Sequence, residues 1–188
     1  MMARLKKHAG WLMLVVMGVA AYANSFTGVF VFDDRLAIQE NLTIRQLATA
    51  LAPPPNSPVA GRPMVNLSLA VNYAISGLEP WSYHVFNLLV HLAAGLTLFG
   101  LVRLSLERLT LWERPSGCDT PDAEPRRTGM GNPPIAFAVA LLWLVHPLQT
   151  EAVTYVTQRT ELLGGLFILL TLYCVARSAV AGQDPVRT

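Results

Sequence analysis

The feature that most constrains this chain is a run of 23 residues without a charged side chain, at residues 10–32 (GWLMLVVMGVAAYANSFTGVFVF). A helix of that length is long enough to cross the roughly 30 Å of hydrocarbon in a bilayer. The whole chain agrees with this reading, because 53% of its residues are hydrophobic, 14% are charged and the mean hydropathy is +0.41. A soluble domain needs more polar surface than that. The sequence therefore predicts an integral membrane protein.

A second interpretation of the same run is a cleaved signal peptide. The basic residues Arg4, Lys6 and Lys7 precede it, and Ala21-Tyr22-Ala23 fits the small-residue pattern of a cleavage site. The apolar run resumes after Asn24, however, and further apolar segments follow. We therefore favour an uncleaved membrane anchor.

Three more apolar segments follow the first, and polar stretches with helical signals separate them. The segment that ends at His146-Pro147 is short, but it can continue into the next helix. A helix with Pro63 in its first turn is expected at 63–76, and a shorter amphipathic stretch begins at Asn41. The predicted fold class is all-α: a polytopic membrane helix bundle of about four transmembrane helices, with short amphipathic helices in the outer loops.

The distribution of Lys and Arg predicts the orientation, since basic residues favour cytoplasmic segments. With the N-terminus inside, ten basic residues are cytoplasmic (Arg4, Lys6, Lys7, Arg103, Arg108, Arg114, Arg126, Arg127, Arg177, Arg187) and four are outside (Arg35, Arg45, Arg62, Arg159). The predicted order is a cytoplasmic N-terminus at 1–9, a span at 10–32, an outer loop at 33–83, a span at 84–106, a flexible cytoplasmic loop at 107–134, a span at 135–147, an outer amphipathic helix at 148–161, a span at 162–181 and a cytoplasmic tail at 182–188.

Polar residues inside the second span are spaced to share one helix face. His84, Asn87 and His91 follow each other at i, i+3 and i+7, and polar groups facing lipid are costly, so we expect this face to point into protein. Packed or hydrogen-bonded histidines are favoured over metal ligands. The two cysteines, Cys118 and Cys174, form no disulfide framework or metal motif, and the basic residues form no nucleic-acid patch.

Two adjacent carboxylates stand at the end of the first apolar run, in the stretch GVFVFDDRLAIQEN. A carboxylate at a membrane surface can act as a general base, and an arginine can hold a phosphate through its guanidinium fork. In the predicted topology the charged candidates share the outer side, and Glu151, Tyr155 and Arg159 recur every four residues as one stripe. This pattern suits transfer between a lipid-linked phosphate and a hydroxyl acceptor. The candidates are Asp33, Asp34, Arg62, His146, Glu151, Arg159 and Glu161.

Structural interpretations of the same residues remain open. The two aspartates also fit a solvated loop start or a helix cap, and Arg62 fits a side chain that snorkels to the interface. Glu151 and Arg159 fit internal ion pairs, and His146 fits a helix end. Two stretches, Asn41-Leu42-Thr43 and Asn66-Leu67-Ser68, match the glycosylation acceptor pattern, which is common by chance.

Three ordered stretches resemble the membrane region of the transmembrane-and-tetratricopeptide-repeat proteins and their bacterial relatives. They are YANSFTGVFVFDD, GRPMVNLSLAVNYAISGLEPWSYHVFNLLVHL and HPLQTEAVTYVTQRTELL. The resemblance runs from about Tyr22 to about Ala176. These proteins are similar in plan to the protein O-mannosyltransferases of the C-type glycosyltransferase superfamily, which are multi-spanning helical enzymes.

The resemblance implies a membrane enzyme that takes a mannose-like sugar from a polyprenyl- or dolichyl-phosphate donor. It implies a catalytic base at Asp33 or Asp34, donor-phosphate binding by Arg62 and Arg159, and site shaping by Glu151 and Glu161; His146 lies in the family pattern HP-x-x-TEAV. A hydroxyl of a protein or glycan would be the acceptor, and the membrane would be the bacterial inner membrane or the endoplasmic reticulum. Some members of the superfamily use a divalent metal and others do not, and the adjacent aspartates do not decide this.

The four predicted spans are fewer than such enzymes have, and no tetratricopeptide repeat is present in the sequence. The expectation is therefore the N-terminal portion of a larger enzyme, and completion of the fold by a partner chain stays open. The alternative is a non-catalytic four-helix membrane scaffold or assembly protein. A transporter is less favoured, because the charges gather at one membrane face rather than at the midplane.

Overall fold

The structure, a computed structural model, describes residues 2–112 and 133–181 of the chain. Most of the loop expected at 107–134 lies outside the described residues, as do Cys118 and the tail expected at 182–188. The described residues form helices and turns and no strand. The α-helices are α1 (Met2–Tyr22), α2 (Pro63–Ser76), α3 (Trp81–Trp112), α4 (Pro133–Leu144), α5 (Gln149–Thr154) and α6 (Arg159–Ala181).

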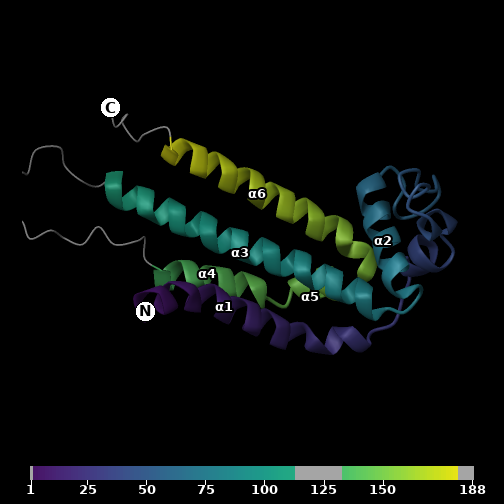
Figure 1. Ribbon diagram of the computed structural model, residues 1–188, viewed down its shortest axis with the longest axis horizontal. Coiled ribbons are helices and arrows are strands. Elements are labelled where there is room, and N and C mark those ends of the chain that lie inside the picture. The colour runs from purple at the N-terminus through teal and green to yellow at the C-terminus, as the bar shows by residue number, and fades with distance from the viewer. Residues whose placement is uncertain (1, 113–132, 182–188) are drawn as a thin grey trace, which may run out of the picture.

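Helices α1, α3, α4 and α6 run along the long axis of the molecule, with α3 at the centre (Figure 1). Helix α3 contacts α6, α4, α1 and α2, and α1 also packs against α4. The loop after α1 and helix α2 form a lobe at one end of the bundle, whereas the start of α1 and the end of α6 lie at the other (Figure 1). We call residues 33–80 the lobe.

Three helices are long and apolar enough to cross a membrane: Ala9–Thr27, Trp81–Leu109 and Val156–Ala179. Helix α4 is apolar but has 12 residues, so it rises only about 18 Å, less than the roughly 30 Å of hydrocarbon. The predicted all-α membrane bundle is confirmed. The first helix is shorter than the apolar run, because α1 ends at Tyr22 and a 3-10 turn, Ala23–Thr27, follows.

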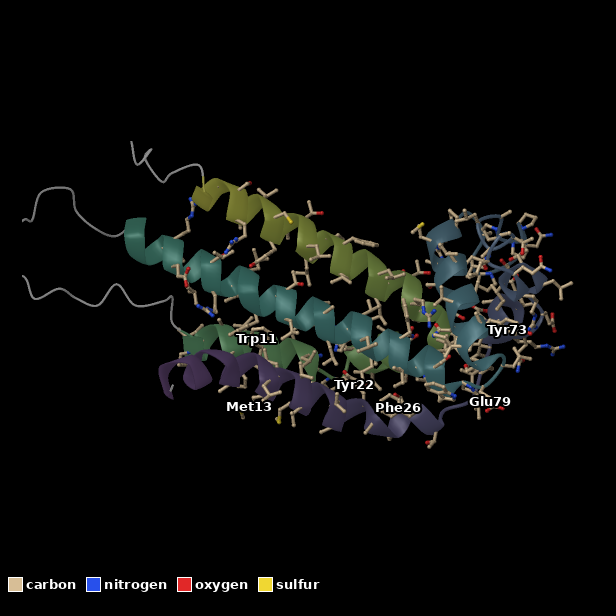
Figure 2. All side chains as sticks on the ribbon, viewed as in Figure 1. Trp11, Met13, Tyr22, Phe26, Tyr73 and Glu79 are labelled. Carbon is tan, nitrogen blue, oxygen red and sulfur yellow. The ribbon has the colours of Figure 1, made fainter. Side chains whose placement is uncertain are left out.

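Helix α4 ends inside the bundle, where side chains of other helices bind the carbonyl of its last residue, Leu144. The carbonyl oxygen of Leu144 accepts a hydrogen bond from the Tyr22 hydroxyl at 3.1 Å, and His91 Nε2 lies 2.8 Å from the same oxygen. The His91 ring stacks on Trp143 and meets the Tyr22 ring edge-on, with centroids 4.9 and 5.4 Å apart. We call Tyr22, His91, Trp143 and the Leu144 carbonyl the Leu144 cap; Figure 2 labels Tyr22.

Buried amides organise the lobe. The Asn66 side chain donates to the Ala50 carbonyl at 2.7 Å and to the Thr43 hydroxyl at 2.9 Å, and its oxygen accepts from the Asn41 amide at 2.8 Å. Asn41 and Asn66 are 1% and 0% exposed. Both glycosylation patterns therefore place their asparagine where no modifying enzyme can reach it in the folded chain.

The prediction of one continuous amphipathic helix at 148–161 is wrong. Helix α5 ends at Thr154, Tyr155 is extended (φ −89°, ψ 115°), a 3-10 turn covers Val156–Gln158, and α6 begins at Arg159. The β-branched residues around the break, Val153, Thr154, Val156 and Thr157, weaken helix propensity. The stripe of Glu151, Tyr155 and Arg159 is lost with the helix, since Glu151 is exposed and Arg159 is fully buried.

Candidate functional site

The candidate site lies at the lobe end of the bundle, where the loop after α1 meets the link between α5 and α6. Asp34 is 1% exposed, and its Oδ1 accepts hydrogen bonds from the Thr157 backbone N–H at 2.8 Å and from the Thr157 hydroxyl. Its Oδ2 accepts from the Val31 N–H at 3.2 Å. Burial raises the pKa of the Asp34 carboxyl, and the hydrogen bonds from Thr157 and Val31 partly oppose that rise. Asp34 thus fastens the first loop to the α5–α6 link.

Asp33 is arranged differently from its neighbour, because its side chain is exposed. Its backbone N–H donates to the Tyr155 hydroxyl at 2.9 Å, which fixes the loop at this point. Partial burial, together with the nearby Asp33 and Asp34 charges, raises the pKa of the Tyr155 hydroxyl and keeps it protonated. Phe32 precedes the pair at φ +44°, a strained conformation for a bulky residue. The strained turn lets one aspartate face water while the next is buried.

Arg159 is 0% exposed, and its guanidinium joins three helices. Nε donates to the Asn87 side-chain oxygen at 2.9 Å, Nη1 to the Ser68 hydroxyl at 3.2 Å and Nη2 to the Tyr83 carbonyl at 3.1 Å. The Phe86 ring lies under the guanidinium, 4.3 Å from Cζ to the ring centroid. Arg159 therefore holds the start of α6 against α2 and α3.

His84 lies beside this arrangement at the start of α3. It is 2% exposed, and neither ring nitrogen has a partner with hydrogen-bonding geometry among the described residues. Nε2 faces the Gly28 backbone so closely that a Cβ on Gly28 would lie 2.8 Å from it. The ring is also close enough to Asp34 to interact with its charge. We call Asp33, Asp34, His84, Thr157 and Arg159 the lobe-side cluster.

The structure brings three of the sequence-predicted residues together and leaves four apart. Asp33, Asp34 and Arg159 meet through the α5–α6 link, whereas no hydrogen bond among the described residues joins the others to them. All four others have exposed side chains. Two of them have local contacts: an Arg62 Nη1 bond to the Pro58 carbonyl at 3.0 Å, and a Leu148 N–H bond to His146 Nδ1 at 3.2 Å. The four are Arg62, His146, Glu151 and Glu161.

Sequence reasoning missed Thr157, whose backbone and hydroxyl both hold Asp34. A single threonine carries no pattern of its own, although Thr157 lies inside the stretch HPLQTEAVTYVTQRTELL. By contrast, the face predicted from His84, Asn87 and His91 is confirmed to point into protein, with exposures of 2%, 0% and 0%. The Asn87 amide approaches the carbonyls of the α5–α6 link at 3.4 Å.

No three His, Cys, Asp or Glu side chains gather as a metal-ligand set within 2–112 and 133–181. Both oxygens of Asp34 are already engaged by N–H and O–H donors. Within the lobe-side cluster, Asp33 has an exposed carboxylate, and it lies next to the buried, hydrogen-bonded side chains of Asp34 and Thr157. Such a carboxylate can accept a proton from a substrate hydroxyl that approaches from the lobe side.

Comparison with known proteins gives relatives along most of this chain. Protein O-mannosyl-transferase Tmtc3 of Drosophila melanogaster is 32% identical over 198 residues, which cover 95% of this chain and 20% of the relative. Protein O-mannosyl-transferase TMTC2 of Homo sapiens is 30% identical over 183 residues (92% and 19%), and human TMTC4 is 32% identical over 183 residues (88% and 23%). The chain spans about a fifth of the length of these relatives.

The resemblance inferred from the three sequence stretches is thus confirmed: the homologues are protein O-mannosyl-transferases of the transmembrane-and-tetratricopeptide-repeat family. No protein-family model matches the chain, and no solved structure matches it significantly. Together with the three membrane-length apolar helices, the homology supports an integral membrane protein.

Proposed function

We propose, from this homology and the lobe-side cluster, that the chain forms part of a membrane glycosyltransferase. The reaction moves a mannose-like sugar from a polyprenyl- or dolichyl-phosphate donor to a hydroxyl group of a protein or glycan, on the extracytoplasmic face. The observation that carries the proposal is the exposed Asp33 carboxylate. The Asp33 backbone N–H donates to the Tyr155 hydroxyl, and the neighbouring Asp34 is held by Thr157.

In this proposal Asp33 is the general base. Its carboxylate takes the proton of the acceptor hydroxyl while the acceptor oxygen bonds to the anomeric carbon of the sugar. The bond between that carbon and the donor phosphate oxygen breaks, and the lipid phosphate leaves with the electron pair. Exposure supports Asp33 over Asp34 for this role, because both oxygens of Asp34 are occupied by Thr157 and Val31.

The two arginines take different parts. Arg62 is the candidate for the donor phosphate, since its side chain is exposed at the N-terminus of α2. Arg159 supports the site as a positioning residue, because its donors face Asn87, Ser68 and Tyr83. Glu151, Glu161 and His146 stay candidates for shaping the site from its exposed side.

Substitution of each aspartate tests the proposal. The unmodified chain and its variants are reconstituted in liposomes with dolichyl-phosphate mannose and a Ser/Thr peptide, and sugar transfer is measured. We expect Asp33→Asn to lower transfer by at least about 100-fold, the usual contribution of a general base, without changing the unfolding temperature. Asp34→Asn is expected to lower both. Glu79→Gln, an exposed carboxylate of the same lobe, is the matched control and should leave transfer unchanged.

A non-catalytic scaffold is the second candidate. The burial of Arg159 and Asp34 favours it, because residues that only stabilise the fold need no access to substrate. A scaffold predicts that the folded, unmodified chain transfers no sugar. It also predicts that the Asp33→Asn variant binds its assembly partner as the unmodified chain does. Full transfer by the Asp33→Asn variant would exclude the base role proposed above.

A further inference from the structure

A second polar site lies toward the end of the bundle opposite the lobe. A cavity of about 470 Å³ opens there between α1, α3 and α6. Residues lining it include Trp11 of α1, Arg103 of α3 and Arg177 of α6. Figure 2 labels Trp11 well away from Tyr73 and Glu79, which mark the lobe. The cavity is large enough for a small-molecule headgroup, because ligand pockets usually measure roughly 300–1,000 Å³.

Arg103 gives this cavity an unsatisfied cationic donor. Its Nε is buried and has no hydrogen-bond partner among the described residues. Its Nη2 is 3.6 Å from Glu107 Oε1, longer than a normal charge-assisted hydrogen bond. Leaving a buried donor of a charged group unpaired costs free energy, so an anionic oxygen in the cavity would stabilise Arg103.

Arg177 adds a second positive charge from the neighbouring helix. Its side chain is exposed near the end of α6, and it lines the same cavity as Arg103. Together with Glu107, the cavity carries two cationic side chains and one anionic side chain, which leaves a net positive site. Two guanidinium groups around one opening are suited to a phosphate group, whose oxygens accept from several donors.

Helix geometry puts these arginines at the level of lipid headgroups. Arg103 follows Trp81 by 22 residues and Arg177 follows Arg159 by 18, so they lie about 33 and 27 Å along their helices from the lobe end. Those distances match the roughly 30 Å thickness of bilayer hydrocarbon. With the lobe at one membrane surface, Arg103 and Arg177 therefore lie at the opposite surface.

The remaining wall of the cavity is apolar and closely packed. Phe99 and Leu96 line it one and two turns before Arg103, toward the middle of α3. Gly100 lets α6 approach, because a Cβ at that position would lie 3.0 Å from the Tyr173 ring. A ligand with a phosphate at the arginines and hydrocarbon along this wall would contact both parts of the cavity.

We propose that this cavity binds the headgroup of an anionic phospholipid, with the phosphate held by Arg103 and Arg177 and an acyl chain along the apolar wall. Basic pockets between membrane helices are suited to anionic lipids, whereas zwitterionic lipids neutralise less of the charge. The site is separate from the proposed donor-phosphate site, which lies at the lobe. It does not depend on the glycosyltransferase proposal.

Native mass spectrometry of the whole 188-residue chain in detergent tests the site, with phosphatidylglycerol and phosphatidylcholine of identical acyl chains added in turn. We expect the chain to retain phosphatidylglycerol at least about tenfold more strongly, equivalent to about 1.4 kcal/mol. Glycerol phosphate, which lacks acyl chains, is expected to be retained far less. Equal retention of the two lipids would overturn the proposal, and equal retention of glycerol phosphate would show a phosphate site rather than a lipid site.

Two variants and a matched control locate the binding. Arg103→Gln and Arg177→Gln each remove one charge from the cavity, and we expect each to abolish the preference for phosphatidylglycerol. Arg108→Gln removes the same charge from the same end of α3 without lining the cavity, and it should keep the preference. The unfolding temperature of each variant is measured alongside, so that a folding defect is recognised. A preference that survives in both cavity variants, or that is lost equally in the control, overturns the proposal.

Discussion

Two histidines on one face of α3 differ in what surrounds them. His91 places Nε2 2.8 Å from the Leu144 carbonyl and lies between two aromatic rings, whereas His84, seven residues earlier, has no hydrogen-bond partner for either ring nitrogen within 2–112 and 133–181. Both are fully or almost fully buried. In the Leu144 cap His91 has one hydrogen-bonded ring nitrogen, and Nδ1 has no partner among the described residues, whereas in the lobe-side cluster neither ring nitrogen of His84 has one and the Asp33 carboxylate is exposed. We call the Leu144 cap the closed part and the lobe-side cluster, which includes the exposed Asp33, the open part.

Removing Arg159 should have the largest effect on stability, because its guanidinium holds α6 against α2 and α3 at the lobe-side cluster. Arg159→Gln loses hydrogen bonds to Asn87, Ser68 and Tyr83 in a fully buried place. We expect the free energy of unfolding in detergent to fall by about 3 kcal/mol or more. Arg62→Gln, an exposed arginine of the lobe, serves as the control and should change it by less than about 0.5 kcal/mol. Similar small losses in both would mean that the buried contacts contribute little.

Truncating each histidine tests the comparison directly. Both His84→Ala and His91→Ala lose buried packing, but only His91→Ala also removes a hydrogen bond to a helix-end carbonyl. We expect His91→Ala to lower the free energy of unfolding by about 1–2 kcal/mol more than His84→Ala. His84→Ala should instead have its larger effect on sugar transfer. Equal stability losses, with transfer unaffected, would remove the distinction between the closed and the open part.

The sequence predicted the membrane helices well because their signal is local. Uncharged runs and the spacing of His84, Asn87 and His91 depend only on neighbouring residues, and the structure confirms both features. The break after Thr154 was not predicted. The β-branched residues around it only weaken helix propensity, and the contact that accompanies it, from the Thr157 N–H to Asp34, joins residues 123 apart in the chain. The same break separates Glu151 from Arg159. Spacing arguments fail where a distant side chain replaces the local helix partner.

The charge on Asp34 should make the open cluster sensitive to pH. Burial raises the Asp34 pKa above its ordinary value, so the folded state binds a proton more tightly than the unfolded state does. The contribution of Asp34 to stability is therefore fully present below the ordinary aspartate pKa of about 3.9 and is lost as pH rises to the raised value, by about 1.4 kcal/mol for each unit between the two. Unfolding temperatures measured across this range should show the fall.

Two variants sharpen the pH prediction. Asp34→Asn removes the titrating group, so this part of the pH dependence should disappear. Thr157→Val removes the hydroxyl whose hydrogen bond lowers the Asp34 pKa, so the window should extend to higher pH. His91→Ala, in the Leu144 cap, is the control variant whose pH dependence is compared with that of these two. An unchanged profile in Asp34→Asn would assign the pH dependence to other groups.

The smallest expected effect concerns backbone strain, which also separates the two regions. Phe32 is the sole non-glycine residue with positive φ among the described residues, and it directly precedes Asp33. Phe32→Gly should relieve strain of about 1 kcal/mol or more, but glycine costs about 0.5–1 kcal/mol of chain entropy. The free energy of unfolding should therefore change by less than about 1 kcal/mol. Transfer should fall, because the turn that points Asp33 outward becomes free to relax.

Val29→Gly, on the same segment at negative φ, has no strain to relieve and should lose stability without that compensation. If both glycine variants lose the same stability, the Phe32 conformation stores no strain for the site.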